Sequence, residues 1–511
     1  MIRRLAHLPG FVFAIVFAWK VALFGLTMQP VPANDSFFYD GAVVNSLNGG
    51  AYCNPSLSLA LKISGTKVFT AYPPLYQGVL WLWMRICGTS EVAAMALHLA
   101  LFGLYLVVMA GIFRRLAIPA VWGNVAGLFL FVITFQDRPD SLAQLLGVSA
   151  ILCWLRAQGQ SAGPHWAWST MLCVVLTLCT SLQLGGIYFC FLWLLTVATY
   201  LVRREKFPAL PLVGTILIPL ALIALVKFRF PDLWAGFQEH AAQTPAVAGA
   251  RMPRLDDLLK VLRTVPGVIG AGLLALAVFW KHPRAAVERF SSVSSLIAWV
   301  SLAAIAGISC VALFYLSTNF ALTAAYLQPL VVGGLLAACA EQPVFQMRRC
   351  LWIGMFVGFA TLGAVRAVGM STWGMACAMD AGHTQAIRMV QDSLNQTPSG
   401  STVAVSAAYL YEAARYKTIR SIHSDWLAPG RHSEHLVELI VRERPVKLVL
   451  TQFDYYRHFE GSVRQLQAQP QLVKVKLTNA ARTPVPDASR RWQRVVQHIS
   501  WAPVIVELDW R

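Results

Sequence analysis

Long, nearly uncharged apolar runs recur along most of this chain, and they limit what it can fold into more than any other feature. A helix needs about 20 mostly apolar residues to cross the hydrocarbon core of a bilayer. Of the 511 residues, 57% are hydrophobic and only 13% are charged, against about 25% charged in an average soluble domain. The sequence therefore predicts a polytopic α-helical membrane protein with about eleven transmembrane helices, at residues 9–28, 91–113, 117–135, 141–156, 166–182, 185–202, 208–227, 264–280, 292–316, 319–340 and 350–369.

Lys and Arg in the short loops predict the orientation, because cytoplasmic loops carry an excess of both. Under strict alternation the basic loop residues fall on one side, from Arg3 and Arg4 to Arg348 and Arg349. We therefore expect a cytoplasmic N-terminus. An odd number of crossings then places the chain from about residue 370 outside the cytoplasm, together with the loops 29–90, 136–140 and 228–263.

Other global features leave two alternatives open. A net charge of +18 could indicate nucleic acid binding, but no basic run is interleaved with exposed aromatics, so membrane lipids with anionic headgroups are the better match. Cys53 and Cys377 lie outside the apolar runs and could form a disulfide. The N-terminal stretch could also be a signal peptide cleaved after Ala33. Lys20 interrupts that stretch, and we expect it to face the bundle interior or an internal water.

The last part of the chain changes character. Short β-rich runs at 403–405, 447–451 and 504–508 alternate with helix-forming stretches at 383–394 and 433–443, which indicates a small α/β domain. It contains no glycine-rich phosphate loop and no nucleophile elbow. We expect a transmembrane domain at 1–369, with its first outer loop at 29–90, and an extracytoplasmic α/β domain at 370–511.

The first outer loop opens with two acids in the stretch "NDSFFYDGAVVNSL". Its spacing predicts an amphipathic helix lying in the membrane interface. Asp35 could be an acid of the first helical turn, where the helix dipole favours a negative charge. Asp40 could likewise be a residue of the exposed face. Taken alone, these structural interpretations are at least as good as functional ones.

Two further motifs change this balance. The loop continues with "YPPLY" at 72–76, and the next outer loop carries "RPD" at 138–140, where a membrane helix opens. An early loop acid followed by these two elements resembles the GT-C glycosyltransferases, and within them the branch of the protein O-mannosyltransferases and lipid A aminoarabinose transferases (families 39 and 83). The resemblance covers roughly the first 200 residues well, and the α/β domain hardly at all.

The resemblance implies a bacterial inner-membrane enzyme of the cell envelope. Such enzymes move a hexose or pentose from a polyprenyl-phosphate donor to a lipid, glycan or protein acceptor on the extracytoplasmic face. The chemistry needs a carboxylate to accept the acceptor's proton, and cations or hydrogen bonds for the leaving phosphate. No cofactor is implied with certainty.

Five residues of these motifs are candidates, three of them for catalysis: Asp35, Asp40 and Asp140. Asp35 matches the loop acid of the family. Asp35 is the expected general base, and Asp40 is a second catalytic candidate that could instead orient the sugar. Asp137 and Asp140 could contact the acceptor, a metal or the donor sugar, although an acid beside a first-turn proline is also an ordinary helix start. Arg138 is a candidate for the phosphate, because its planar fork matches phosphate oxygens.

Other loop residues are candidates for substrate binding. Lys67 could bind the phosphate or be a solvated loop lysine, and Tyr72 and Tyr76 could line the cavity. Glu239 and His240, in the loop 228–263, could contact substrate, and the resemblance makes them possible ligands of a divalent metal. The first loop offers no Glu to complete such a set, so no metal site is predicted, and an amphipathic interface helix is the simpler interpretation.

Two rival functions remain open. A transporter or flippase of lipid-linked saccharides would also need many helices and a polar cavity. Transporters commonly show internal repeats and paired broken helices, and this sequence shows neither. A non-enzymatic scaffold would fit if Asp35 were dispensable.

Overall fold

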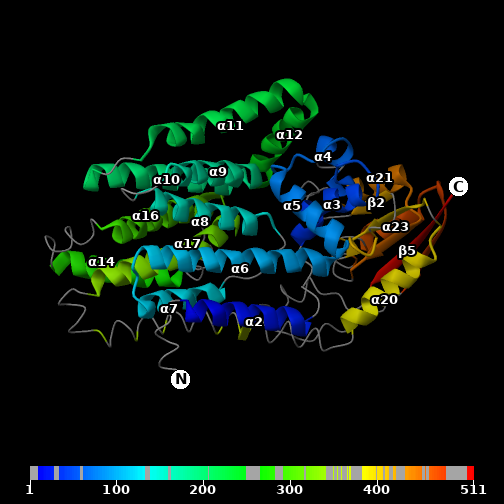
Figure 1. The fold of residues 1–511 in the computed structure, drawn as a ribbon. Helices are drawn as coiled ribbons and strands as arrows, with labels where there is room; N and C mark the ends of the chain where they lie inside the picture. Colours follow the sequence, from blue (N-terminus) through cyan, green and yellow to red (C-terminus); the bar gives the residue numbers. More distant parts are fainter. Residues whose placement is uncertain are drawn as a thin grey trace.

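A computed structural model gives the fold of the chain. It describes residues 10–27, 34–57, 61–132, 138–158, 163–204, 207–248, 265–281, 292–315, 318–340, 382–398, 400–406, 409–413, 418–421, 432–451, 460–478 and 503–511, together with the positions 349, 354, 358, 365, 368, 369 and 455. Long helices fill one end of the molecule and a β-sheet lies at the other, with the short helices of the first loop between them (Figure 1).

Ten of the described helices form the bundle, and each lies within or closely overlaps one of the first ten expected spans. They are α2 (Phe11–Thr27), α6 (Glu91–Arg115), α7 (Ala120–Leu128), α8 (Asp140–Ala157), α9 (His165–Thr180), α10 (Leu182–Arg203), α11 (Ala209–Arg229), α14 (Pro266–Lys281), α16 (Val293–Tyr315) and α17 (Thr318–Cys339). By length and composition, the 3 helices α6, α10 and α11 could each cross a bilayer. Most of the eleventh span, 350–369, and Cys377 lie outside the described residues, so the count of eleven crossings stays a prediction.

Polar contacts inside the bundle join helices that are distant in sequence. Tyr105 on α6 donates a hydrogen bond of 2.6 Å to the backbone oxygen of Tyr326 on α17. Gly147 on α8 leaves room for the ring of Tyr188 on α10, because a Cβ at this position would overlap that ring. Small residues permit such close approach between membrane helices. Lys20 on α2 is buried, as expected, with its Nζ 4.8 Å from the centroid of the Trp19 ring.

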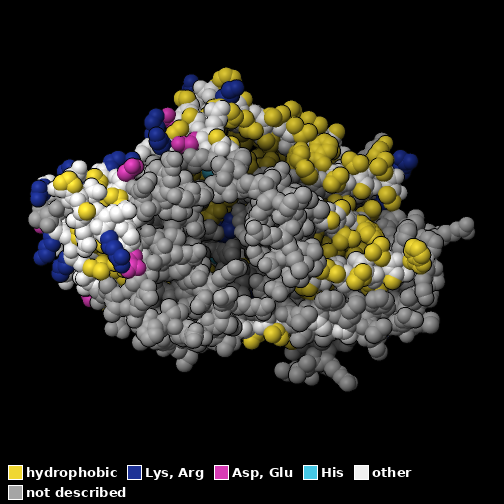
Figure 2. Space-filling view, turned by 180° about the vertical axis from the view of Figure 1, so that it is seen from behind, with side chains coloured by type: hydrophobic (Ala, Val, Ile, Leu, Met, Phe, Trp, Pro, Cys, Tyr) yellow, Lys and Arg dark blue, Asp and Glu magenta, His cyan; other side chains and the backbone are white. Residues whose placement is uncertain are grey.

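The outer surface of the bundle is apolar. Large hydrophobic side chains gather over α10 and α11, while Lys, Arg, Asp and Glu gather at the sheet end and around the top of the view in Figure 2. On α11 alone, the exposed ones include Leu210, Val213, Leu217, Leu220 and Ile223. An apolar surface of this extent is typical of contact with lipid rather than with water.

The first loop folds into α3 (Asn34–Leu47), the 3₁₀ turn η1 (Pro55–Leu57), α4 (Lys62–Thr66) and α5 (Leu75–Cys87). The helix expected at its start is therefore present, but the interpretation of Asp40 as a residue of its exposed face is wrong. Every residue from 38 to 44 is buried, including Asp40. The reason is that Phe38, Ala42 and Val43 pack against α5 and α6 in a second apolar core.

The C-terminal part of the chain contains a 5-stranded sheet in the order β2-β1-β3-β5-β4. Its strands are β1 (Thr402–Val405), β2 (Thr418–Ser421), β3 (Lys447–Leu450), β4 (Leu472–Thr478) and β5 (Val504–Trp510). Strand β1 pairs in parallel with β2 and β3, whereas β5 pairs antiparallel with β3 and β4. β1, β3 and β5 coincide with the β-rich runs of the sequence. The boundary near residue 370 and the extracytoplasmic side of this part stay predictions.

Helices cover both faces of this sheet because strand side chains alternate between its faces. On one face Val403, Val405 and Val449 pack against α20 (Gly382–Asn395). On the other face Leu448 and Val506 pack against α21 (His432–Glu443) and α23 (Glu460–Gln467). The segment after β1 leaves the sheet toward the first loop, where Leu410 joins the apolar core around α3 and α5.

Candidate active site

A buried ion pair marks the start of α8. The side chains of Arg138 and Asp140 flank Pro139, and the two residues are 6% and 5% exposed. Arg138 Nε lies 3.0 Å from Asp140 Oδ2. The Nε–H does not point along this line, so the contact is an ion pair rather than a well-directed hydrogen bond. Charges are rarely buried unless they are paired, so the pair is a specific feature of this loop.

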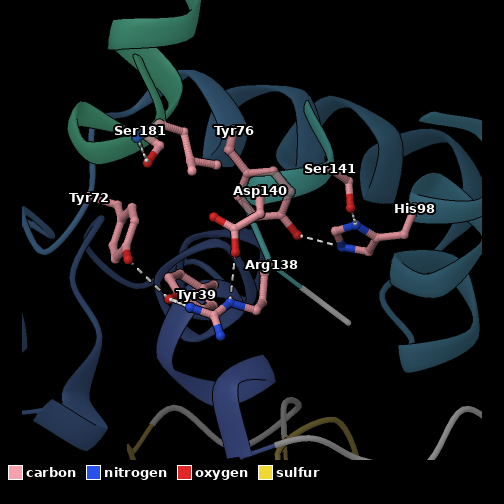
Figure 3. A network of polar contacts seen from close by, with 9 residues as sticks. Tyr39, Tyr72, Tyr76, His98, Arg138, Asp140, Ser141 and Ser181 are labelled. Atoms are coloured by element: carbon pink, nitrogen blue, oxygen red, sulfur yellow. Dashed lines mark hydrogen bonds and ion pairs between the residues drawn. The ribbon is translucent and has the colours of Figure 1, made fainter. Parts of the chain in front are cut away.

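Two tyrosines of the first loop complete what we term the Arg138 cluster, which consists of Tyr39, Tyr72, Arg138 and Asp140. Arg138 Nη2 donates to Tyr39 Oη over 3.2 Å, and its guanidinium carbon lies 5.6 Å from the centroid of the Tyr39 ring. Tyr39 Oη in turn donates to Tyr72 Oη over 3.2 Å. Figure 3 shows these four side chains converging from α3, from the segment before α5 and from the start of α8.

A second polar group, which we term the Asp40 chain, runs beside this cluster and consists of Asp40, Tyr76, His98, Ser141 and Tyr411. Tyr76 Oη lies 3.5 Å from Asp40 Oδ1 and 2.9 Å from His98 Nε2. His98 Nδ1 lies 3.0 Å from Ser141 Oγ (Figure 3). Tyr411, from the segment after β1, donates to Asp40 Oδ2 over 2.6 Å.

Helix α12 (Pro231–Ala248), which lies within the loop 228–263, packs against the first loop through Glu239. Its two carboxylate oxygens accept the backbone N–H groups of Lys62 and Ile63 over 2.8 and 3.0 Å. These are orphan donors at the start of α4, which a carboxylate can satisfy. Gly236 allows the close approach, since a Cβ there would overlap the side chain of Thr70.

Two other candidates of this region lie near α12. Lys67 forms an ion pair of 2.9 Å with Asp232, but the side chains are 59% and 61% exposed, so the pair contributes little to stability. The ring of His240 lies 6.4 Å from that of Tyr72. Burial lowers the pKa of His240, and the Glu239 carboxylate opposes this shift. The lowered pKa favours the neutral imidazole.

No metal site emerges in the described part of the chain. Groups of three or more His, Cys, Asp or Glu side chains that could hold an ion are absent from it. The carboxylate of Glu239, a ligand candidate, is instead engaged with the backbone of α4. The residues that the structure describes therefore do not fit a divalent metal.

The structure brings together five of the ten candidate residues: Asp40, Tyr72, Tyr76, Arg138 and Asp140. His240 borders this group at Tyr72. Glu239 holds α12 against the first loop, and Lys67 forms only the exposed pair with Asp232. Asp35 lies in the first turn of α3, but its side chain and the whole of Asp137 lie outside the described residues, so their roles stay predictions.

Three residues of the Asp40 chain were missed by the sequence reasoning. His98 and Ser141 could have been found, because a polar side chain within a membrane helix is expensive and is commonly functional or paired. His98 is the only histidine in the span 91–113, and Ser141 directly follows "RPD". Tyr411 carries no comparable signal, since its partner Asp40 lies 371 positions away.

Sequence comparison finds no match for this chain, whereas structure comparison finds proteins of similar fold. No family model matches the sequence, and no curated protein matches it. The crystal structure of ArnT from Cupriavidus metallidurans bound to undecaprenyl phosphate matches with a TM-score of 0.55 at 14% identity, covering 97% of both chains. The apo form of ArnT matches equally well, with a TM-score of 0.55 at 15% identity.

A second relative in fold is the oligosaccharyltransferase AglB from Archaeoglobus fulgidus, solved with an inhibitory peptide and a dolichol-phosphate. It matches with a TM-score of 0.50 at 11% identity, over 90% of this chain and 72% of that chain. ArnT, the lipid A aminoarabinose transferase, and AglB are both GT-C proteins. At these identities the likeness concerns the fold alone. The fold of this chain is similar to those of ArnT and AglB, which belong to the superfamily that its loop motifs resemble.

Proposed function

We propose that this chain is a membrane glycosyltransferase that moves a hexose or pentose from a polyprenyl-phosphate donor to an extracytoplasmic acceptor. The observation that carries the proposal is the Arg138 cluster, in which the start of α8 meets the first loop in a chain with the fold of ArnT. The ArnT structure contains undecaprenyl phosphate. A lipid-linked phosphate needs an apolar surface for its tail and a cation for its headgroup, and this chain offers α10 and α11 for the tail and Arg138 for the headgroup.

The leaving phosphate is the first requirement of the reaction. As the bond between the anomeric carbon and the phosphate oxygen breaks, negative charge develops on the phosphate. A guanidinium presents several donors in a fixed plane and matches phosphate oxygens well. Asp140 and Tyr39 hold Arg138 in place before substrate enters, so little reorganisation is needed during the reaction.

The proton of the acceptor is the second requirement. The acceptor oxygen forms a bond to the anomeric carbon and releases its proton, which a carboxylate must accept. We assign this role to Asp35. Position 35 lies four residues before Tyr39 on α3, and positions so spaced share one face of a helix. Tyr39 lies on this face of α3, and its hydroxyl accepts the hydrogen bond from Arg138.

The proposal extends to the placement of the chain. Residues 1–369 form the transmembrane domain of a bacterial inner-membrane protein with a cytoplasmic N-terminus, and residues 370–511 form the extracytoplasmic domain. The partners are the lipid-linked donor, membrane lipids and a lipid, glycan or protein acceptor. The location of the first loop between the bundle and the sheet supports this arrangement, because a site there lies next to both the apolar bundle and the C-terminal part (Figure 1).

The test compares purified wild type with Asp35→Asn in proteoliposomes supplied with a panel of radiolabelled polyprenyl-phosphate sugars. Transfer of label to extracted envelope acceptors is measured. Wild type should transfer label from one donor, and Asp35→Asn should lose at least 99% of turnover, since general bases contribute about 10²- to 10⁴-fold. Asp232→Asn is the matched control, because this exposed acid lies outside both polar groups, and it should retain full activity.

Two outcomes would contradict the proposal. Label that stays on the donor but crosses the bilayer would identify a flippase. Full turnover by Asp35→Asn would remove Asp35 as the base and leave the enzyme to be explained by another acid of the site.

A further inference from the structure

The carboxylate of Asp40 is the centre of an arrangement that the proposed chemistry does not use. Asp40 is 0% exposed, and its two oxygens face tyrosine hydroxyls of different parts of the chain. Tyr411 Oη lies 2.6 Å from Oδ2, and Tyr76 Oη lies 3.5 Å from Oδ1. The shorter contact is typical of a strong hydrogen bond to a carboxylate. A buried acid held in this way is positioned to fix its helix rather than to meet a substrate.

The Asp40 chain continues from Tyr76 to the start of α8. Ser141 Oγ–H can donate to His98 Nδ1 over 3.0 Å. Nδ1 is then the acceptor, so the ring proton of His98 lies on Nε2. His98 Nε2–H then donates to Tyr76 Oη over 2.9 Å, and the Tyr76 hydroxyl proton is left for Asp40. With the hydrogen bonds oriented in this way, every contact of the Asp40 chain from α8 through α6 and α5 to α3 has one donor proton.

Two members of the Asp40 chain lie beside the residues of the proposed reaction. Ser141 directly follows Asp140, and Asp40 directly follows Tyr39, so each is one residue from the Arg138 cluster. The third attachment is Tyr411, which belongs to the C-terminal part. Its neighbour Leu410 is buried in the first-loop core, and β2 packs against η1 of the same loop.

We propose that Asp40 is a positioning residue whose contact with Tyr411 makes turnover depend on the docked C-terminal part. The contact fixes the rotation of α3 about its own axis, and this rotation sets where Tyr39 and position 35 face the start of α8. The inference rests on the proposed function, and it assigns the C-terminal part a role within the catalytic step rather than in acceptor binding alone.

The experiment uses Tyr411→Phe, which deletes one hydroxyl and keeps the ring. The matched control is Tyr52→Phe in the first loop. Tyr52 Oη is buried, and it has no hydrogen-bond partner among the described residues, so deleting it removes no contact. Both variants and the wild type are measured as full-length protein in proteoliposomes with the radiolabelled donor that wild type uses, and kcat is calculated per folded molecule.

Tyr411→Phe should lower kcat about tenfold, which corresponds to the loss of one hydrogen bond to a charged group. KM for the donor should change less than about twofold, because the phosphate contacts are not touched. Asp40→Asn should also lower kcat, because it removes the negative charge that strengthens this hydrogen bond. Combining it with Tyr411→Phe should add little, since both changes weaken the same contact. Tyr52→Phe should match wild type.

Three outcomes would overturn the inference. A Tyr411→Phe protein with a lower melting temperature but an unchanged kcat would give the contact a purely structural role. Additive losses from Asp40→Asn and Tyr411→Phe would show that they act separately. Absence of transfer by the wild type with every donor would defeat the proposed function itself, and the positioning role with it, so the two failures are distinguished by the wild type.

Discussion

Breaking the buried Arg138–Asp140 pair on one side should destabilise the protein more than removing both partners. The atoms Nε and Oδ2 are 3.0 Å apart, and the side chains are only 7% and 8% exposed. At this distance the Coulomb attraction is about 5 kcal/mol with an effective dielectric constant of about 20. Arg138→Met leaves the carboxylate buried without that attraction, and the expected loss in unfolding free energy is about 3–5 kcal/mol.

The double variant tests the origin of this loss. Arg138→Met combined with Asp140→Asn leaves no uncompensated charge, so it should be less destabilised than Arg138→Met alone. We expect a coupling energy of about 2–3 kcal/mol between the two changes. The assay is a denaturant titration in one detergent, followed by Trp fluorescence, for wild type, both single variants and the double variant.

An exposed ion pair in the same region supplies the control. Lys67→Met removes one partner of the Lys67–Asp232 pair, whose side chains are 59% and 61% exposed. It should cost less than about 1 kcal/mol, because solvent screens such pairs. If Arg138→Met costs no more than Lys67→Met, or if the single losses simply add in the double variant, the reasoning from burial is refuted.

Two further predictions concern the contacts around the site. Glu239→Ala should lower the unfolding free energy by about 0.5–2 kcal/mol, as on loss of a helix cap, since two backbone N–H groups at the start of α4 lose their carboxylate partner. A melting temperature equal to that of the exposed Gln238→Ala variant would contradict this. Burial raises the pKa of Glu412 from 4.5 to about 7, so the folded state holds a proton that the unfolded state has already released, and stability falls as pH rises through this window. Glu412→Gln should therefore leave the melting temperature nearly unchanged at pH 5 and raise it at pH 8, where the gain in unfolding free energy is up to about 3 kcal/mol. An identical shift of the melting temperature at both pH values would exclude a titrating Glu412.

Local patterns in the sequence predicted the elements well. Long apolar runs indicated the bundle helices, and β1, β3 and β5 lie where short β-branched runs indicated strands. Hydrophobic periodicity is a property of neighbouring residues, so it can be recognised without the tertiary fold. The loop motifs around Tyr72 and Arg138 likewise pointed to residues that the structure brings together.

The surroundings of individual side chains could not be predicted in the same way. The sequence pattern around Asp40 is the same whether its side chain is exposed or lies within the protein. Its burial depends on packing against α5 and on Tyr411, which is hundreds of residues away in sequence. The engagement of Glu239 with α4 is also a long-range contact, 177 positions from Lys62. Long-range pairs of this kind leave no trace in a single sequence.

The order of the strands bears on how the protein is made. β5 lies between β3 and β4, and within the described residues it is the last strand in sequence. Until the ribosome has passed residue 510, β4 lacks the strand with which it pairs. The bundle can insert into the membrane well before this point, so a newly made chain should pass through an interval in which the helices are in place and the sheet is still open. A stop codon ahead of residue 504 would extend this interval indefinitely, and we expect the resulting chain to be degraded by the quality control of the compartment in which the sheet folds.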